Sequence, residues 1–184
     1  MTRAPLAILL TCLLTTACAR SSVTGGLSVA AQPEITSSEE LEALLLSRDF
    51  EKIALERMAT GHSLVHVSIN GSTPRRFVCD TGSGATLVFP ALAEELGLLP
   101  ESTGHSAGGI GGQGMELLNI EIDSLAVGGV RFSDRELLVL DLSHLNQQFE
   151  AAGEDPIEGI IGAPWLTAHE VVLDIPANAL FARP

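Results

Sequence analysis

Short stretches in which apolar and polar residues alternate recur from residue 50 to the end of the chain, and they predict β-strands. Val65, Val67 and Ile69 alternate with polar neighbours, and Asn70-Gly71 then favours a tight turn into an apolar run at 76–79. This segment is therefore expected to form a hairpin. Comparable runs predict further strands at 118–122, 137–140, 157–161 and 171–175, with 180–181 closing the sheet. The pattern indicates a mostly β domain.

Helical spacing is confined to a few short segments. Ser37 followed by Glu40 is a capping-box pattern, and the leucines after it predict a helix over about 37–48, within an N-terminal helical segment 37–50. Residues 91–96 predict a second short helix that ends at Gly97. Three other segments are assigned from their composition: one or two helical turns at 163–169, a polar helix or loop at 143–155, and a glycine-rich loop at 104–114.

Residues 1–19 have the layout of an export signal, with a basic start, an apolar stretch too short for a comfortable membrane span, and small residues at the end. Two cleavage patterns fit. Thr15-Thr16-Ala17-Cys18 resembles the bacterial lipobox, with Thr where Leu is preferred, and would make Cys18 the lipidated first residue. Ala17-Cys18-Ala19 instead fits an A-x-A site that leaves a soluble chain from Arg20.

The lipidated alternative is favoured because Cys18 lies where the apolar stretch ends and a polar segment begins. That segment, residues 20–36, is rich in Ser, Thr, Gly and Ala and predicts a flexible tether. We therefore expect an exported protein of the bacterial envelope, either periplasmic or anchored to the membrane as a lipoprotein.

Composition limits the size and the partners of the folded part. The chain has 184 residues, 46% of them hydrophobic, which suffices for one compact core. Its 10 Lys+Arg against 23 Asp+Glu give a formal charge of -13, which would repel a nucleic-acid backbone. We therefore expect no nucleic-acid partner. The acidic residues are spread along the chain and are interpreted as solvated surface.

The candidate chemistry lies at Asp80-Thr81-Gly82-Ser83, directly after the apolar run at 76–79. A carboxylate at the end of a strand suits acid–base work when a following Gly lets the backbone turn tightly and a hydroxyl neighbour can stabilise the turn. The tripeptide D-T-G by itself is better explained by an Asx turn that ends a strand. The residues around it change that balance.

Residues 77–88 resemble the active-site strand and loop of retropepsin-like aspartic proteases of the bacterial single-domain kind. Residues 108–112 fall where that family has its glycine-rich flap, and residues 160–166 are similar to the apolar-apolar-Gly segment and short helix that close its fold. The resemblance covers about 50–182. It implies a retropepsin-like closed β-barrel with two or three short helices over 51–184, and it places the first strand at 52–58.

The resemblance also implies roles for individual residues. In the active-site loop, Asp80 would be the catalytic acid–base residue, and Thr81 would clasp the same loop of a second copy. Gly82 would let the backbone approach, and Ser83 could hydrogen-bond the carboxylate from the side. The flap would consist of Gly109, Ile110, Gly111 and Gly112, and structural support beneath the site would come from Ile161 and Gly162.

Aspartic proteases use two carboxylates that share one proton, because charges so close together cannot both form. This chain has one D-T-G, and none of its other aspartates has the same turn chemistry. The second carboxylate is therefore expected from Asp80 of another copy across a two-fold axis. The expected function is an aspartic endopeptidase that cleaves protein or peptide substrates as a homodimer. The alternative is a non-catalytic retropepsin-like module for peptide binding or assembly.

Three other signals point to no further chemistry. Residues 109–114 satisfy G-x-G-x-x-G but lead into a strand, not a helix, so no dinucleotide is expected. His62 and His66 lack neighbouring ligands that would complete a metal site. Cys79 is the one cysteine beyond the export segment and is expected to be a buried, inert thiol. We expect neither a cofactor nor a metal.

Overall fold

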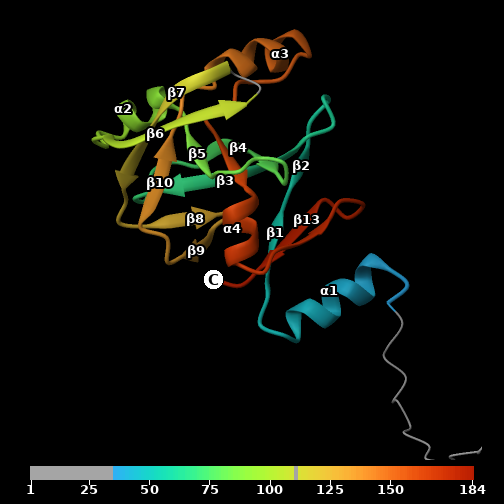
Figure 1. Ribbon diagram of the computed structural model, residues 1–184. Coiled ribbons are helices and arrows are strands. Elements are labelled where there is room, and N and C mark those ends of the chain that lie inside the picture. Colours follow the sequence, from blue (N-terminus) through green and yellow to red (C-terminus); the bar gives the residue numbers. More distant parts are fainter. Residues whose placement is uncertain (1–34, 110–111) are drawn as a thin grey trace, which may run out of the picture. The chain divides into compact units, whose positions relative to one another are not determined.

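The structure, a computed structural model, describes residues 35–109 and 112–184 (Figure 1). The predicted export signal, Cys18 and residues 20–34 of the predicted tether lie outside the described residues, as do Ile110 and Gly111 of the predicted flap. No helix in the described ranges is both long and apolar enough to cross a membrane.

Strands make up most of the regular structure in the described residues, and the predicted mostly β class is confirmed. The strands are β1 (Glu51–Ala54), β2 (Glu56–Arg57), β3 (Ser63–Ile69), β4 (Arg75–Asp80), β5 (Leu87–Val88), β6 (Glu101–Gly109), β7 (Gly112–Glu121), β8 (Leu125–Val127), β9 (Val130–Phe132), β10 (Glu136–Val139), β11 (Gly159–Gly162), β12 (Val172–Asp174) and β13 (Ala179–Ala182). The helices are α1 (Ser38–Leu46), α2 (Pro90–Glu95), α3 (Asn146–Ala151) and α4 (Ala163–Ala168), with a 3₁₀ turn η1 (Ser143–Leu145).

The strands form two sheets. In the larger sheet the order is β6-β7-β10-β5-β11-β4-β3-β8-β9, with β2 added to β3, and in the smaller sheet it is β1-β13-β12. The larger sheet is open, because its end strands β6 and β9 do not pair with each other, so the expected closed barrel is not formed by hydrogen bonds. Three α-helices, α2, α3 and α4, lie in the described part of 51–184, in agreement with the two or three short helices expected there.

Both sheets contribute to a shared apolar interior. The largest cluster of buried side chains includes Ile53 of β1, Val67 of β3 and Leu180 of β13, so β1 and β13 of the small sheet pack against the large sheet. A second cluster, which includes Leu64, Leu87 and Ile160, lies near the end of the sheet where α3 is found. Burial of these apolar side chains is the main force that fixes the relative positions of the strands.

The predicted hairpin and the predicted first helix are confirmed, with one difference in the helix cap. Strands β3 and β4 pair antiparallel, and Asn70 (φ 52°) and Gly71 (φ 74°) adopt the left-handed conformation that a tight turn requires. The Ser37 hydroxyl accepts a hydrogen bond from the Glu40 amide, as the capping box predicts. The Glu40 carboxylate, however, accepts hydrogen bonds from the amide and the hydroxyl of Thr36. The capping box predicts the amide of the next residue, Ser37, as the donor.

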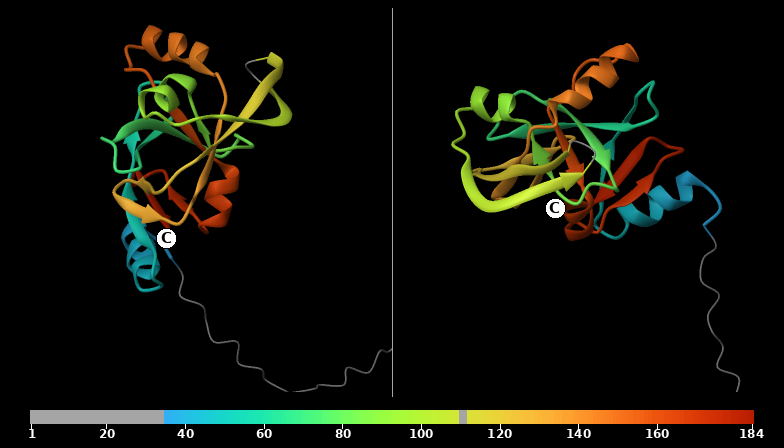
Figure 2. Two further views of the ribbon diagram at one scale, coloured as in Figure 1. Left: turned by 90° about the vertical axis from the view of Figure 1, so that its left-hand side faces the viewer. Right: turned by 45° about the horizontal axis from the view of Figure 1, so that its top comes forward.

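The predicted glycine-rich loop at 104–114 is wrong. The segment forms parts of β6 and β7, which pair antiparallel with register shifts after Ser102 and after Ala107. Glycine has a low strand propensity, so its abundance in this segment favours a loop. In the structure, backbone hydrogen bonds between β6 and β7 hold the described residues of the segment extended. Figure 2 shows this hairpin projecting beyond the rest of the sheet.

Candidate active site

Strand β11 is inserted between β4 and β5, and this insertion positions the D-T-G loop. β4 ends at Asp80, the chain then turns through residues 81–86 and returns as β5 on the far side of β11. β11 runs parallel to β4, with Gly162 opposite Asp80, and antiparallel to β5, with Ile160 opposite Leu87. The loop that joins β4 to β5 therefore crosses over the end of β11, which pairs with both of these strands.

Asp80 is half-buried at the end of β4, and one of its carboxylate oxygens is held by the loop. The Gly82 amide donates to Oδ1 at 2.8 Å, and the Ser83 amide donates to the Asp80 carbonyl at 3.2 Å. The motif is thus an Asx turn, in line with the structural explanation of D-T-G, and the same turn orients the acid. Among the described residues Oδ2 has no hydrogen-bond donor, so it is free to meet water, a substrate or a second carboxylate.

Two neighbours in the loop differ in how they match their expected roles. The Ser83 hydroxyl does not reach the Asp80 carboxylate. It donates to the Ala85 carbonyl, two residues further along the loop, at 2.8 Å. Thr81 is exposed, and its expected contact with a second copy stays a prediction.

The support beneath the loop is tightly packed at Ile161 and Gly162. Ile161 is fully buried. A Cβ atom added to Gly162 would lie 2.1 Å from the Ala85 carbonyl oxygen, so only glycine fits between β11 and the loop. Two successive amides bind the loop from below: the Gly162 amide donates to the Thr86 hydroxyl at 3.1 Å, and the Ala163 amide donates to the Ser83 carbonyl at 2.9 Å.

Thr86 has no role in the sequence analysis, although it lies within the D-T-G neighbourhood. The signal that could have found it is a hydroxyl residue immediately before a two-residue strand. Such a short strand leaves backbone groups of its neighbour without a ladder partner, and a side-chain hydroxyl can replace the missing carbonyl.

A cavity of about 410 Å³ opens beside Asp80. Its walls come from the D-T-G loop, the β6–β7 hairpin, the segment around η1, and β11. The described lining residues are Asp80, Gly82, Ser83, Gly84, Ala85, Leu87, Ala107, Gly108, Met115, Leu117, Leu140, Leu142, Leu145 and Ile160. Asp80 is the one ionisable side chain among them, so the cavity presents a single acid to an otherwise mostly apolar surface.

The hairpin contributes to this cavity just short of its tip. Gly109 pairs with Gly112 at the end of the ladder, and Ile110 and Gly111 between them lie outside the described residues. Ala107, Gly108 and Met115 form the cavity wall. The expected flap position is therefore next to Asp80, and its role as a lid stays a prediction.

Cys79 lies beside the acid but contributes no nucleophile. Burial, and secondarily the charge of Asp80, raises the pKa of the Cys79 thiol to about 11. The thiol is therefore protonated at neutral pH, as expected for an inert cysteine. In residues 35–109 and 112–184 no three His, Cys, Asp or Glu side chains gather as a metal site would require, His62 and His66 included.

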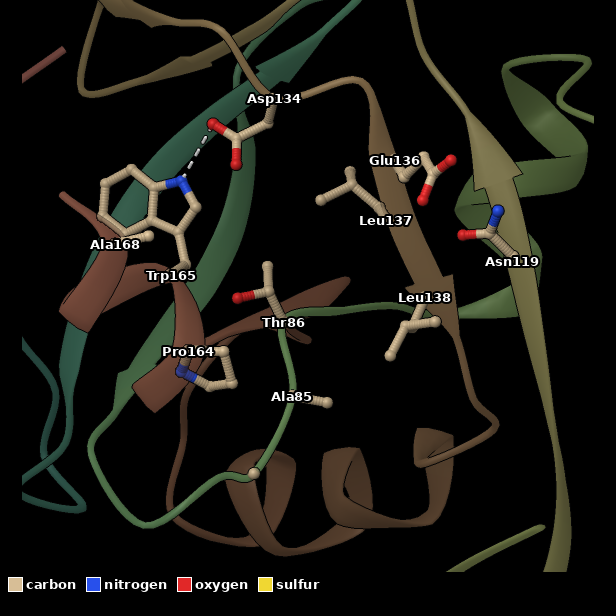
Figure 3. Close-up of a pocket in the computed structure, with 11 residues that line it drawn as sticks. Ala85, Thr86, Asn119, Asp134, Glu136, Leu137, Leu138, Pro164, Trp165 and Ala168 are labelled. Atoms are coloured by element: carbon tan, nitrogen blue, oxygen red, sulfur yellow. Dashed lines mark hydrogen bonds between the residues drawn. The ribbon is translucent and has the colours of Figure 1, made fainter. Parts of the chain in front are cut away.

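A second cavity of about 330 Å³ lies on another side of the same loop (Figure 3). Ala85 and Thr86 form one wall of it, and Pro164 and Trp165 of α4 form another. At its edge Asp134 accepts a hydrogen bond from the Trp165 indole at 3.3 Å. The helix that begins directly after Gly162 is therefore fixed to the segment between β9 and β10.

The end of α4 is held by a buried histidine. His169 Nε2 lies 3.1 Å from Asp134 Oδ2, and its Nδ1 lies 2.9 Å from the Arg183 carbonyl. A carbonyl oxygen only accepts, so Nδ1 donates to the Arg183 carbonyl. This bonding connects α4 to the end of the chain and stiffens the support of the active-site loop.

Comparison with known proteins identifies the family. A family model described as aspartyl protease matches residues 65–165, more than half of the chain. A retropepsin-like aspartic protease from Rickettsia conorii superposes with a TM-score of 0.51 at 18% identity, covering 72% of this chain and 90% of that one. This likeness shows the retropepsin-like fold.

Two further structures are similar at lower scores. The retroviral protease-like domain of Ddi1 from Leishmania major gives a TM-score of 0.47 at 18% identity, covering 71% of this chain and 88% of that one. The EIAV protease in complex with the inhibitor HBY-793 gives 0.43 at 22% identity, covering 58% and 86%. No curated protein sequence matches the chain significantly. From the family match over residues 65–165, the chain belongs to the aspartyl protease family.

Proposed function

We propose that the protein is an exported aspartic endopeptidase that hydrolyses peptide bonds with a pair of Asp80 carboxylates, one from each copy in a homodimer. The observation that carries this proposal is the setting of Asp80. Its Oδ1 is held by the Gly82 amide, and its side chain is the one ionisable group among the described residues lining a cavity of about 410 Å³. One acid in this setting needs a second, and a two-fold axis supplies the same residue.

The chemistry follows from the close approach of two carboxylates. At such a distance one of them keeps a proton and the other is charged. The charged carboxylate removes a proton from water, whose oxygen attacks the peptide carbonyl carbon, while the neutral carboxyl donates its proton to the carbonyl oxygen. Proton transfer to the amide nitrogen then lets the C–N bond break, and the pair regains its single shared proton.

The residues around Asp80 give this chemistry its support. The Gly82 amide fixes the direction of one carboxylate oxygen without neutralising the other. The β6–β7 hairpin would close over a bound peptide and exclude water, a role for which its glycines are suited. Exposed Thr81 would join the two loops across the dimer axis.

The proposed activity is tested with Asp80→Asn beside the wild type, on a denatured protein and a peptide library across about pH 3–7, the range in which a shared-proton pair operates. Asp123→Asn, which changes an exposed acid in the same way, is the control. We expect cleavage by the wild type and the control and none by Asp80→Asn. If all three proteins are equally inert while folded, the alternative of a non-catalytic peptide-binding or assembly module replaces the enzyme.

We also propose that the mature chain is attached to the bacterial membrane through a lipid on Cys18. Support comes from the lipobox-like residues 15–18 at the end of an apolar stretch. Detergent partitioning of the wild type and of Cys18→Ser distinguishes the two cleavage patterns. If Cys18 carries a lipid, the wild type enters the detergent phase and Cys18→Ser does not. Equal recovery of both in the aqueous phase would contradict it.

A further inference from the structure

We propose that Thr86 is a positioning residue for Asp80. Its hydroxyl accepts a hydrogen bond from the amide of Gly162, the residue that pairs with Asp80, and thereby holds the active-site loop in the conformation that orients the acid. The inference rests on the proposed function, because positioning matters only if Asp80 carries out the reaction. It assigns a role to a side chain that lies behind the loop and does not line the cavity beside Asp80.

The first step concerns the ladder between β5 and β11. That ladder pairs Gly159 with Val88 and Ile160 with Leu87, and there it ends. The Gly162 amide lies beyond the last pair and donates to the Thr86 hydroxyl at 3.1 Å. The hydroxyl therefore replaces the carbonyl that a longer β5 would have offered, and without it the amide of a buried glycine would lack this partner.

The second step concerns the distance from this bond to the acid. Gly162 is the residue of β11 that pairs with Asp80 of β4. The hydrogen bond from Gly162 to Thr86 thus connects the last residue of the loop to the position on β11 that lies beside Asp80. The Ala163 amide adds a second tie, to the Ser83 carbonyl at 2.9 Å.

The third step concerns what these ties leave free to move. The bond from the Gly82 amide to Asp80 Oδ1 belongs to the same loop, residues 81–86, that the Thr86 and Ser83 ties hold. Thr86 is half-buried against the cavity behind the loop, where Pro164 and Leu138 also lie (Figure 3). The open space on that side offers no packing that would keep the turn in place if the Thr86 bond were lost. Displacement of a reacting group by about 1 Å can cost a factor of about 100 in rate.

The test compares Thr86→Val, which keeps the shape and removes the hydroxyl, with Thr86→Ser, which keeps the hydroxyl. Ser72→Ala is the matched control, because Ser72 accepts the Ile69 amide at the same 3.1 Å in the distant β3–β4 turn. If Thr86→Val does not fold, Thr86→Ala takes its place. Peptide turnover gives kcat and KM, thermal unfolding gives the loss of stability, and amide exchange by NMR reports on Gly82 and Gly162 individually.

We expect Thr86→Val to lower kcat at least about tenfold with KM within about twofold, because the acid is misplaced while the cavity stays intact. Thr86→Ser should retain kcat within about twofold, and Ser72→Ala should lower the melting temperature without lowering kcat. Two results would overturn the inference: a kcat loss in Ser72→Ala equal to that in Thr86→Val, or no rescue by Thr86→Ser.

Failure of the proposed function is distinguishable from failure of this inference. If the wild type cleaves no peptide, the function fails, and amide exchange alone decides the role of Thr86. Faster exchange of both the Gly82 and Gly162 amides in Thr86→Val, with wild-type rates in Thr86→Ser, would then support positioning. Unchanged exchange at Gly82 would refute it.

Discussion

The strands beneath Asp80 and the hairpin beside it use glycine for opposite purposes. In β11 a Cβ on Gly159 would lie 2.4 Å from the Leu87 carbonyl oxygen, and one on Gly162 would lie 2.1 Å from the Ala85 carbonyl oxygen. In the hairpin a Cβ on Gly104 or Gly114 would have nothing within 4 Å, but both residues have positive φ values, 70° and 78°. Glycine gives close packing in the first region and backbone freedom in the second.

This difference indicates how the site divides its mechanical tasks. The acid is carried by a region in which Gly159 and Gly162 leave no room for a side-chain atom between β11 and its neighbours, and hydrogen bonds join strands, loop and α4. In the hairpin, Gly104 and Gly114 have open space around the position of a Cβ atom. The proposed function requires such a division, with a rigid carrier for the acid and an adaptable cover over the substrate.

The largest effect is expected from Gly162→Ala. Gly162 has φ –101°, which any residue adopts, so the substitution tests space alone. The added methyl group must displace the loop backbone, and we expect a loss of about 3 kcal/mol in the free energy of unfolding, with loss of turnover. Urea unfolding and a peptide assay measure both. Gly84→Ala, in the same loop with nothing within 4 Å, is the stability control and should cost far less.

A smaller effect is expected from Gly114→Ala in the hairpin. The methyl group has room, so the cost is the strain of a non-glycine residue at φ 78°, about 1 kcal/mol. Urea unfolding again gives the number. A loss as large as that of Gly162→Ala would show that the hairpin is as densely packed as the strands beneath Asp80, and the contrast between the two regions would no longer hold.

The smallest structural effect concerns Cys79. The reactivity of its thiol reports how well the end of β4 is buried, and no substitution at the site is needed to measure it. With a pKa raised from 9.0 to about 11, the folded thiol holds its proton where the unfolded one loses it, so this contribution to stability falls as pH rises from about 9 towards 11. At pH 8 the thiolate fraction is about a hundredfold lower than in the unfolded chain.

Alkylation by iodoacetamide in a Cys12→Ser, Cys18→Ser background measures this reactivity directly. We expect very slow labelling of the folded protein and rapid labelling in urea. Equal rates in both states would mean that the end of β4 is open to solvent, which is incompatible with a rigid carrier for Asp80.

The sequence predicts the carrier of the acid better than the hairpin. Alternation at Val65, Val67 and Ile69, the Asn70-Gly71 turn and the D-T-G motif identify β3, β4 and the active-site loop, because apolar patterning and turn chemistry are local signals. The glycines of 104–114 carry no such signal, so the sequence predicts a loop there. The two strands of this segment pair with each other, with Gly108 opposite Gln113 and Gly109 opposite Gly112, so backbone hydrogen bonds hold extended a segment whose side chains show no strand preference.

The contacts within the site depend on geometry that no motif contains. The motif allows Ser83 to hydrogen-bond the carboxylate, but its hydroxyl donates to the Ala85 carbonyl instead. Thr86 acquires its partner only because β11, about 75 residues later in the chain, enters the space between β4 and β5. The expected closed barrel likewise depends on whether two distant edge strands meet, which the sequence pattern does not determine.

The central claim, that two copies each supply one Asp80, is tested most directly by mixing wild type with Asp80→Asn at constant total concentration and allowing the subunits to exchange. If the site needs both acids, activity follows the square of the wild-type fraction, so an equal mixture retains about one quarter of full activity, as random pairing requires. A linear decline, with one half retained in the equal mixture, would show that a single chain is active by itself and would contradict the account.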